Sequence, residues 1–346
     1  MTKIYLVRHA EAEGNLYRIA HGHYNGLITD WRGPKQIRAL AQRFEGIRVD
    51  AVYSSDLYRT QTTAQAVYVP KHLPLHTSPA FREVHMGAWE GHTWQEVSRL
   101  WPKEFYHFNR RIDLWQPEGG ENARQVLERY LPALEEVARA HDGETIALFS
   151  HGAALRIVLG TLQGLTLREV GTSPHGDNTA VSLLEYENGR FRVVFRDDNS
   201  HLTGSDELSI FAKQTWWKNE DAVEQGTEFA PMPDALRAQL GVPRPGEATL
   251  IRLGSEPVGA LQSHTEGDAG WVDWYWLAPV WRGRRFGIPP MGQLVQRYRE
   301  LGLPFLRLRC ADPALRPFFA RLGFYDAADG VMEKDIHERI PQIITV

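Results

Sequence analysis

The chain has 346 residues, of which 42% are hydrophobic and 24% charged, so it has a globular composition and a length that suggests about two domains. The 39 basic and 43 acidic residues give a net charge of −4, which argues against non-specific nucleic-acid binding. A single cysteine, Cys310, excludes an intrachain disulfide. No signal-peptide pattern and no apolar run of ~18 residues is present, so we expect a cytoplasmic protein without a membrane segment.

Three short apolar runs, each followed by a polar turn that carries Arg or His, organise the first half of the chain. The runs are residues 4–7, 50–53 and 145–149. Helical patterns follow the second and third runs, at residues 60–66 and 153–162. Short apolar runs separated by helices predict a parallel sheet, in which the turns after the strands lie at one edge.

That edge would collect two guanidinium and two imidazole groups, from Arg8, Arg59, His9 and His151. Such groups repel one another unless they face an anion. Taken alone, Arg8 and His9 fit a buried strand with two surface polar residues equally well. The recurrence of the pattern in three turns favours an anion site.

Four ordered stretches resemble the histidine phosphatase (phosphoglycerate mutase-like) superfamily. They are Leu-Val-Arg-His-Ala at 6–10, Tyr-Ser-Ser-Asp-Leu-Tyr-Arg-Thr at 53–60, Arg-Glu-Val-His-Met-Gly-Ala-Trp-Glu-Gly at 82–91, and Phe-Ser-His-Gly at 149–152. The resemblance extends to about residue 202. It implies a first domain at 1–202 with a three-layer αβα fold and a mostly parallel sheet.

The resemblance also implies a phosphomonoester site. His9 would be the nucleophile that forms a phosphohistidine, and Glu83 the general acid, which must hold a proton when the substrate is bound. Arg8, Arg59 and His151 would bind the phosphoryl oxygens; each arginine offers a planar fork, and His151, if protonated, adds a third cationic donor. No metal is implied. Glu90 competes with Glu83 for the acid role, although we favour a structural hydrogen bond for Glu90.

Further residues would line the substrate pocket. Asn15 is expected to orient the loop or the phosphate, and Thr29 resembles a family pocket residue, with one extra residue before Gly33. The aromatic-rich segment 94–115 predicts helices that cap the pocket. Within it, Arg110 and Arg111 are candidates for a second anion contact, and a solvated face is the alternative.

The second half, residues 203–346, resembles the GCN5-related acetyltransferase fold, an α+β domain. Antiparallel strands are predicted at 249–253, 258–264 and 271–277, a helix up to about 301 and a strand at 305–310, while 208–218 fits a strand or a helix. The residues that would hold the CoA pyrophosphate are Arg282, Gly283, Arg284, Arg285 and Gly287. Two departures count against acetyl transfer: Arg285 replaces a glycine, and Phe319 replaces a proton-donating tyrosine.

The sequence therefore predicts a metal-independent phosphatase that acts on a small phosphorylated metabolite, fused to a region that binds CoA or acetyl-CoA. A phosphoglycerate mutase and a bifunctional phosphatase/N-acetyltransferase are the alternatives. The second region could instead stabilise the chain, bind a partner or sense a metabolite. Neither the phosphoester nor the oligomeric state follows from the sequence.

Overall fold

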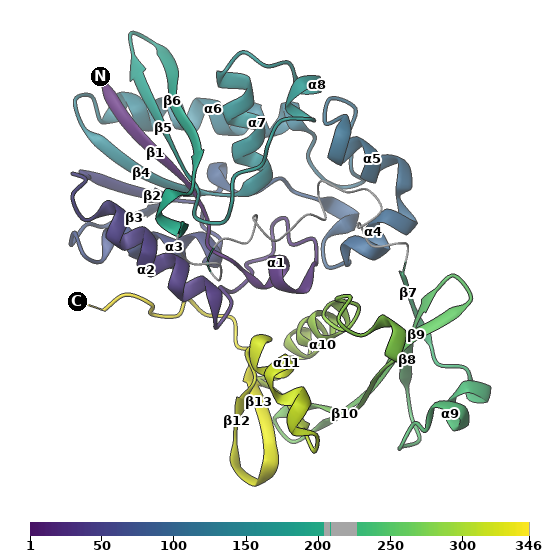
Figure 1. The fold of residues 1–346 in the computed structure, drawn as a ribbon. Coiled ribbons are helices and arrows are strands. Elements are labelled where there is room, and N and C mark those ends of the chain that lie inside the picture. The colour runs from purple at the N-terminus through teal and green to yellow at the C-terminus, as the bar shows by residue number, and fades with distance from the viewer. Residues whose placement is uncertain (204–207, 209–226, 346) are drawn as a thin grey trace.

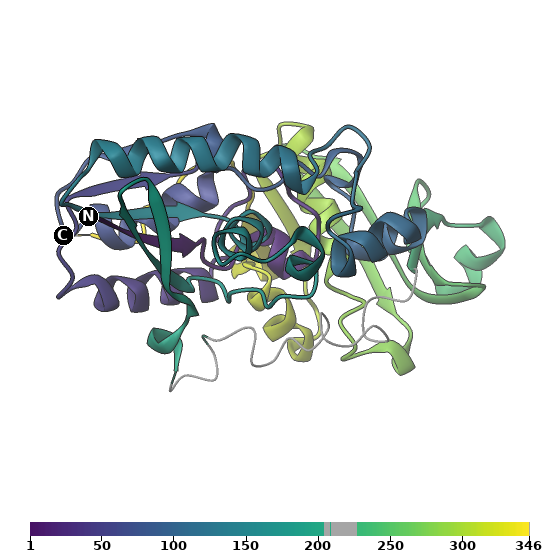
Figure 2. The same ribbon diagram turned by 90° about the horizontal axis from the view of Figure 1, so that it is seen from above.

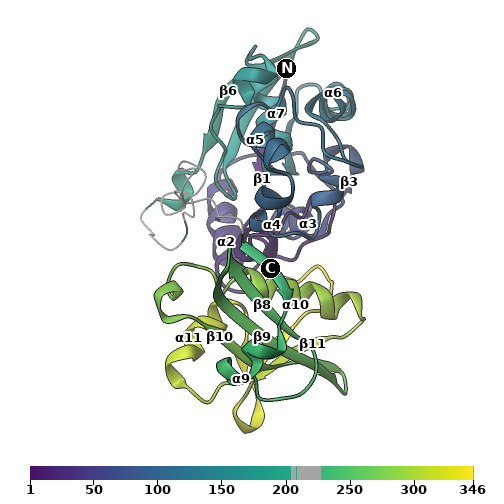
Figure 3. The ribbon, with the colours of Figure 1, turned by 90° about the vertical axis from the view of Figure 1, so that its right-hand side faces the viewer.

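The computed structural model describes residues 1–203, 208 and 227–345, and these form two sheets with their helices. The part of the chain that builds the first sheet lies above the part that builds the second (Figure 1, Figure 3). The segment 208–218, considered above as a strand or a helix, lies outside the described residues except for Leu208.

The first sheet has the order β3-β2-β4-β1-β5-β6. Its strands are β1 (Thr2–Arg8), β2 (Ala51–Ser54), β3 (Leu75–Thr77), β4 (Thr145–Ser150), β5 (Val181–Glu187) and β6 (Arg190–Asp198). The pairs β1–β4, β2–β4 and β2–β3 are parallel, whereas β1–β5 and β5–β6 are antiparallel. The mostly parallel sheet expected from the sequence is therefore present.

Helices cover both faces of this sheet and complete the three layers. Helices α2 (Arg32–Phe44) and α3 (Tyr58–Tyr68) pack on one face, and α6 (Ala123–Ala140) and α7 (Gly152–Leu162) pack on the other (Figure 2). In β1, Ile4 and Leu6 belong to the core under α6 and α7, while Val7 belongs to the core under α2 and α3. This alternation explains why the first strand reads as a continuous apolar run.

Short helices complete this half of the chain: α1 (Glu13–Tyr17), α4 (Trp94–Leu100), α5 (Pro102–Arg110) and α8 (Leu167–Val170). Strands β5 and β6 form a hairpin. Its two-residue loop, Asn188 and Gly189, has positive φ angles of 51° and 77°, as a turn that matches the strand twist requires.

The second sheet has the order β12-β13-β11-β10-β9-β8-β7. Its strands are β7 (Thr227–Pro231), β8 (Ala248–Leu253), β9 (Glu256–Glu266), β10 (Ala269–Leu277), β11 (Phe305–Arg309), β12 (Tyr325–Asp326) and β13 (Val331–Asp335). The predicted antiparallel series β8–β9–β10 is confirmed, and β10 pairs with β11 in parallel. The accompanying helices are α9 (Asp234–Leu240), α10 (Pro289–Glu300) and α11 (Arg316–Arg321).

Each half of the chain contributes residues to the hydrophobic core of the other half. Tyr17 and Ile19, which follow the first strand, belong to the core cluster formed with α10 and β11. The C-terminal segment runs back to the first sheet, where Ile343 and Ile344 pack on the core under α2 and α3 (Figure 1). None of the helices in the described part of the chain is long and apolar enough to cross a bilayer.

Candidate active site

A cavity of about 160 Å³ opens at the edge of the first sheet where the parallel strands end. Its lining includes Arg8, His9, Asn15, Arg59, Glu83 and Gly152. Since Arg8 is aligned with Ser150 in the β1–β4 pair, the next residues, His9 and His151, leave the sheet side by side. Their ring centroids are 5.4 Å apart. The parallel register thus brings together side chains that are 142 positions apart in the chain, counting from 9 to 151.

The hydrogen bonds of His9 leave one ring nitrogen available for attack. Nδ1 lies 2.7 Å from the carbonyl oxygen of Ala10, which can only accept, so Nδ1 carries the proton and Nε2 carries the lone pair. Burial, assisted by the charges of Arg59 and Arg8, holds the pKa of His9 well below its ordinary value. A neutral imidazole with a free Nε2 is the form that a nucleophile requires.

His151 is also neutral, so it is not the third cationic donor that a protonated ring would have been. Its Nδ1 accepts a hydrogen bond from Arg59 Nε at 3.2 Å, so the ring proton resides on Nε2. Burial and the charge of Arg59 hold the pKa of His151 well below its ordinary value. Nε2 is buried and has no partner within the described residues. His151 is not among the residues that line the cavity, so its Nε2–H is a buried neutral donor beside the His9 ring.

Arg59 braces a loop rather than offering the planar fork that we expected. Its Nη1 donates to the carbonyl oxygens of Tyr24 and Asn25, the latter at 2.9 Å, and Nη2 donates to Gly22 at 2.8 Å. With the bond to His151, four of its five N–H groups are occupied. Burial lowers the pKa of Arg59 to about 10, which still leaves it charged. Arg59 therefore supplies charge and one N–H to the cavity.

Arg8 lies across the start of α7. Its Nη1 donates to the carbonyl of Gly176 at 2.5 Å. A Cβ atom at Gly152 would lie 3.0 Å from Arg8 Nε and 3.1 Å from Cζ, so the absence of a side chain at Gly152 permits this approach. The guanidinium is thereby held next to the N-terminus of α7, where backbone N–H groups also favour anions.

Glu83 lies in a loop, with its carboxyl group at the N-terminus of α7. Oε1 accepts from the backbone N–H groups of Ala154 at 2.8 Å and Val84 at 3.0 Å, and Oε2 accepts from Ala153 at 3.1 Å. The side chain lines the cavity and is largely buried. These bonds fix the carboxyl group in the wall of the cavity.

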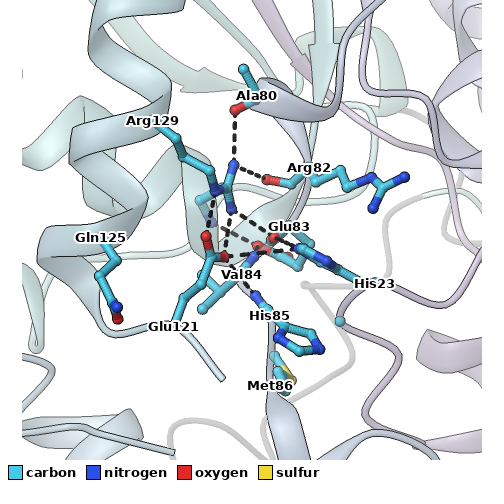
Figure 4. Close-up of polar contacts among 12 residues, drawn as sticks. His23, Ala80, Arg82, Glu83, Val84, His85, Met86, Glu121, Gln125 and Arg129 are labelled. Carbon is cyan, nitrogen blue, oxygen red and sulfur yellow. Dashed lines mark hydrogen bonds and ion pairs between the residues drawn. The ribbon is translucent and has the colours of Figure 1, made fainter. Parts of the chain in front are cut away.

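A second guanidinium, from Arg129 of α6, holds the loop that carries Glu83 (Figure 4). Nη1 and Nη2 donate to the carbonyls of Ala80, Arg82 and Glu83 at 2.8 to 3.0 Å, and the remaining two N–H groups bind Glu121 at 2.7 and 2.9 Å. All five donors of Arg129 are used.

His23 adds a second contact to the Glu83 carbonyl, through Nε2 at 2.9 Å (Figure 4). Burial lowers the pKa of His23 to about 4, so the ring is neutral at pH 7 and Nε2 donates to the carbonyl. Glu90 accepts from the backbone N–H groups of His23 and Met86 at 2.9 and 3.0 Å, which is the structural role that we favoured for it.

Of the predicted pocket residues, Asn15 lines the cavity and Thr29 does not. Asn15 Oδ1 accepts from Asn178 Nδ2 at 3.2 Å, and the same amide donates to the carbonyl of His9 at 2.9 Å. Thr29 is buried beneath Glu11, to which its hydroxyl donates at 3.1 Å, and it accepts from Gly33 N–H. The extra residue before Gly33 coincides with this inward placement.

Arg110 and Arg111 also lie away from the cavity. They line a separate surface depression with residues of α8, and Arg111 forms two 2.9 Å bonds with Asp113. The predicted aromatic cap is present, because Trp94, Phe105 and Phe108 of α4 and α5 line the cavity. The cap is therefore apolar, and the second anion contact assigned to Arg110 and Arg111 is not part of it.

Besides Arg129, sequence reasoning missed lining or supporting residues at Arg18, His175 and Asn178. His175 and Asn178 precede β5. Because β5 runs antiparallel to β1, the residues before it lie at the same edge as those after β1 and β4. The polar residues at 172–179, directly before β5, were the signal. Arg18 ends α1 with a φ of 61°, and burial, with the charge of Arg285, lowers its pKa to about 9.

In the second half, the loop between β10 and α10 carries the residues proposed for CoA. Arg285 adopts a φ of 68° where the resemblance expects glycine, so the substituted position does use a left-handed conformation. Pro289 and Pro290 begin α10 and have no N–H to offer a phosphate. Tyr275 donates to the carbonyl of Gly287 at 2.6 Å.

The sequence profile of the histidine phosphatase superfamily (branch 1) matches residues 4–199. The chain belongs to the histidine phosphatase superfamily. It is 32% identical over 205 residues to phosphoserine phosphatase 1 of Hydrogenobacter thermophilus, covering 58% of this chain and 95% of that protein. It is 30% identical over 209 residues to the metal-independent phosphoserine phosphatase of Arabidopsis thaliana, covering 59% and 84%.

Among solved structures, Bacillus stearothermophilus YhfR superposes with a TM-score of 0.56 at 30% identity, covering 58% of this chain and 99% of that one. The profile match ends before the second sheet begins, so the acetyltransferase resemblance of the second half receives no support from it. Within the described residues, no group of three or more His, Cys, Asp or Glu side chains is placed to hold a metal ion.

Proposed function

We propose that the chain is a metal-independent phosphomonoesterase that works through a phosphohistidine on His9. The observation that carries the proposal is the His9–Ala10 hydrogen bond, because it leaves Nε2 as a lone pair inside a cavity that also contains Arg8 and Glu83. Two relatives that the chain matches over 95% and 84% of their length are named as phosphoserine phosphatases, one of them as metal-independent.

In the first step, His9 Nε2 attacks phosphorus, the N–P bond forms and the ester P–O bond breaks. The electron pair of that bond goes to the alkoxide, which takes a proton from Glu83. In the second step, water attacks the phosphohistidine while the Glu83 carboxylate removes its proton. The N–P bond breaks, inorganic phosphate leaves, and His9 is again neutral. Positioned acid catalysis contributes roughly 10²- to 10⁴-fold.

The phosphoryl oxygens would accept hydrogen bonds from both charged and neutral donors. Arg8 supplies a charged donor next to the N-terminus of α7. His151 supplies a neutral Nε2–H, and Arg59 supplies its remaining N–H together with its charge. Since a phosphoryl transition state spreads charge over three oxygens, preorganised donors of this kind lower its energy without a metal.

We propose a small phosphorylated metabolite as the substrate, with phosphoserine as the first ester to test because two relatives bear that activity in their names. The cavity of about 160 Å³ and its aromatic cap fit a small leaving group. The test is phosphate release from a panel of esters with and without EDTA. Release that requires a metal, or no release from any ester, would refute the proposal.

A phosphoglycerate mutase is the alternative on the same site. It would return the phosphoryl group to a second hydroxyl instead of to water. The Gly-Gly-Glu segment at 119–121, whose Glu121 binds Arg129, and the relatively short middle insertion favour the phosphatase. Interconversion of 2- and 3-phosphoglycerate without phosphate release would establish the mutase instead.

For the second half, we propose a domain at 203–346 that binds CoA or acetyl-CoA, after a first domain at 1–202. The feature that supports it is the succession of antiparallel strands, the Arg-Gly loop after β10 and the helix α10. The two prolines that begin α10 weigh against pyrophosphate binding, and Phe319 weighs against a bifunctional N-acetyltransferase. Calorimetry of the full chain with acetyl-CoA tests this, and absence of both heat and thermal shift would remove it.

A further inference from the structure

Helix α1 begins four residues after His9, yet it packs into the core of the second half of the chain (Figure 1). Tyr17 is 1% exposed, and its hydroxyl donates to the carbonyl of Leu322 at 3.0 Å. On α10, a Cβ atom at Gly292 would come within 2.4 Å of Tyr17 Cβ, so α1 and α10 meet at closest approach there. The segment after the nucleophile is thus anchored by residues more than 270 positions away, from 17 to 292.

A buried group of charges joins the same two elements. Glu13 of α1 is 3% exposed, and its carboxylate lies 3.1 Å from Arg299 Nη1 and 3.8 Å from Lys334 Nζ. Lys334 also binds Asp30 at 2.9 Å. Burial alone would raise the pKa of Glu13, but the charges of Arg299 and Lys334 outweigh burial and lower it. Glu13 is therefore ionised and depends on cations from the second half of the chain.

The opposite side of α1 faces the cavity. Gly14 and Asn15 line the cavity, and Asn15 Oδ1 accepts from Asn178, whose amide also binds the His9 carbonyl. A movement of α1 would consequently reach His9 through one hydrogen-bonded side chain. The Ala12 N–H, which donates to Asn15 Oδ1 at 3.1 Å, ties the intervening turn to the same atom.

The C-terminal segment provides a second brace, on the helix that carries Arg59. Gln65 of α3 donates to the carbonyl of Pro341 and accepts from Ile343 N–H, both at 2.7 Å. Earlier in α3, Thr63 Oγ1 accepts from the N–H of Ala10, the residue that fixes the tautomer of His9. Helices α1 and α3, which both hydrogen-bond to the residues around His9, therefore also contact the second half of the chain.

We propose that Arg299 and Lys334 are positioning residues of the phosphatase site, which hold α1, and through Asn15 the His9 turn, in the reactive arrangement. The second half of the chain is then part of the catalytic unit rather than an appended domain. This inference rests on the proposed phosphatase reaction.

The test compares Arg299→Met with Arg297→Met in the full chain. Arg297 lies on the same helix but is half-exposed, and its ion pair is with the exposed Glu247, at 3.7 Å. Without Arg299, the Glu13 carboxylate loses its nearest cation and α1 shifts towards water. Because a displacement of about 1 Å can cost 10²-fold in rate, we expect kcat for p-nitrophenyl phosphate to fall about 10- to 100-fold in Arg299→Met and to stay within about twofold in Arg297→Met.

Two further measurements distinguish a displaced His9 turn from a loss of folded protein. A smaller folded fraction lowers apparent kcat without changing the inhibition constant of inorganic phosphate, whereas a displaced His9 turn raises that constant. Glu13→Gln in the Arg299→Met background removes the uncompensated charge, so it should restore most of kcat. If Arg299→Met does not fold, kcat and the inhibition constant of inorganic phosphate are measured for Arg299→Lys, which keeps the charge but not the two-point contact.

The inference is overturned if Arg299→Met matches Arg297→Met in kcat and phosphate inhibition, or if Glu13→Gln does not rescue it. Hydrogen exchange gives an answer independent of activity: amides of residues 13–18 should exchange faster in Arg299→Met than in Arg297→Met, and equal rates would also overturn it. A wild-type chain that hydrolyses no ester refutes the proposed function instead, and the exchange comparison still decides whether Arg299 holds α1.

Discussion

Replacing Arg129 tests whether Glu83 acts as the general acid, because the hydrogen bonds of Arg129 hold the loop that carries Glu83. Arg129→Met removes three bonds to the carbonyls of Ala80, Arg82 and Glu83 and two to Glu121. Breaking a buried ion pair by removing one partner costs about 3–5 kcal/mol. Since the Arg129 side chain is 21% exposed, we expect the lower end, about 3 kcal/mol of stability.

The effect on rate should depend on the leaving group. Glu83 keeps its two N–H bonds from α7 and the one from Val84, so its carboxyl group is displaced rather than lost. We therefore expect the low end of the acid-catalytic range, about 10²-fold in kcat, for phosphoserine, whose alkoxide needs a proton. p-Nitrophenyl phosphate releases a stable anion and needs no acid, so its kcat should fall less than about threefold.

The assay is phosphate release from both esters, measured at a temperature where urea titration shows the variant to be folded. Arg124→Met is the matched control, because Arg124 lies on the same helix and is exposed. Equal losses for the two esters would contradict the acid role of Glu83, and an unchanged rate with phosphoserine would show that its carboxyl group keeps its position without Arg129.

Three further outcomes follow from the site. EDTA should leave phosphate release unchanged, as the proposed donors are all protein groups; inactivation that added metal reverses would contradict the metal-free site. Gly152→Ala should lower kcat/KM about tenfold or more while the helix is retained, because the new Cβ would press on Arg8 at 3.0 to 3.1 Å and displacement of a positioned group costs rate; unchanged kinetics would show that Arg8 has room to move. Stability should fall with pH below about 6.5, since burial lowers the pKa of His21 to about 3 and of His201 to about 4. Each ring is neutral in the folded protein and takes up a proton more readily in the unfolded chain. The stability that each ring contributes is therefore complete above pH 6.5. It is lost at up to about 1.4 kcal/mol per pH unit as the pH falls towards the pKa of the folded state. Urea titrations at pH 7 and 5 measure this, and His201→Gln should reduce the slope; an unchanged slope would place the pH dependence elsewhere.

The edge of the parallel sheet was predictable because strand order and direction fix where the residues after β1 and β4 must lie. The sequence thus located Arg8, His9 and His151 without any knowledge of loop shape. It did not predict which atoms would take the N–H groups of Arg59. Those are carbonyls of the 22–25 loop, and a backbone carbonyl leaves no trace in the residue pattern.

Other misses have local causes. Strand β7 ends in Pro231, which weakens a strand pattern and is tolerated because β7 is at the sheet edge. Helix α1 has five residues, which is too short for the spacing of its apolar residues to indicate which hydrophobic core buries Tyr17. Its burial against α10 depends on a glycine at 292, far along the chain. Contacts between residues so far apart in the chain are seen only in the structure.

The most direct test of the central claim is to identify the phosphorylated residue during turnover. The enzyme is mixed with excess substrate, quenched in alkali, which preserves phosphohistidine, and digested for mass spectrometry. The account predicts phosphate on His9, no label in His9→Ala, and loss of all phosphate release in that variant. A label on another residue, or full hydrolysis by His9→Ala, would contradict it.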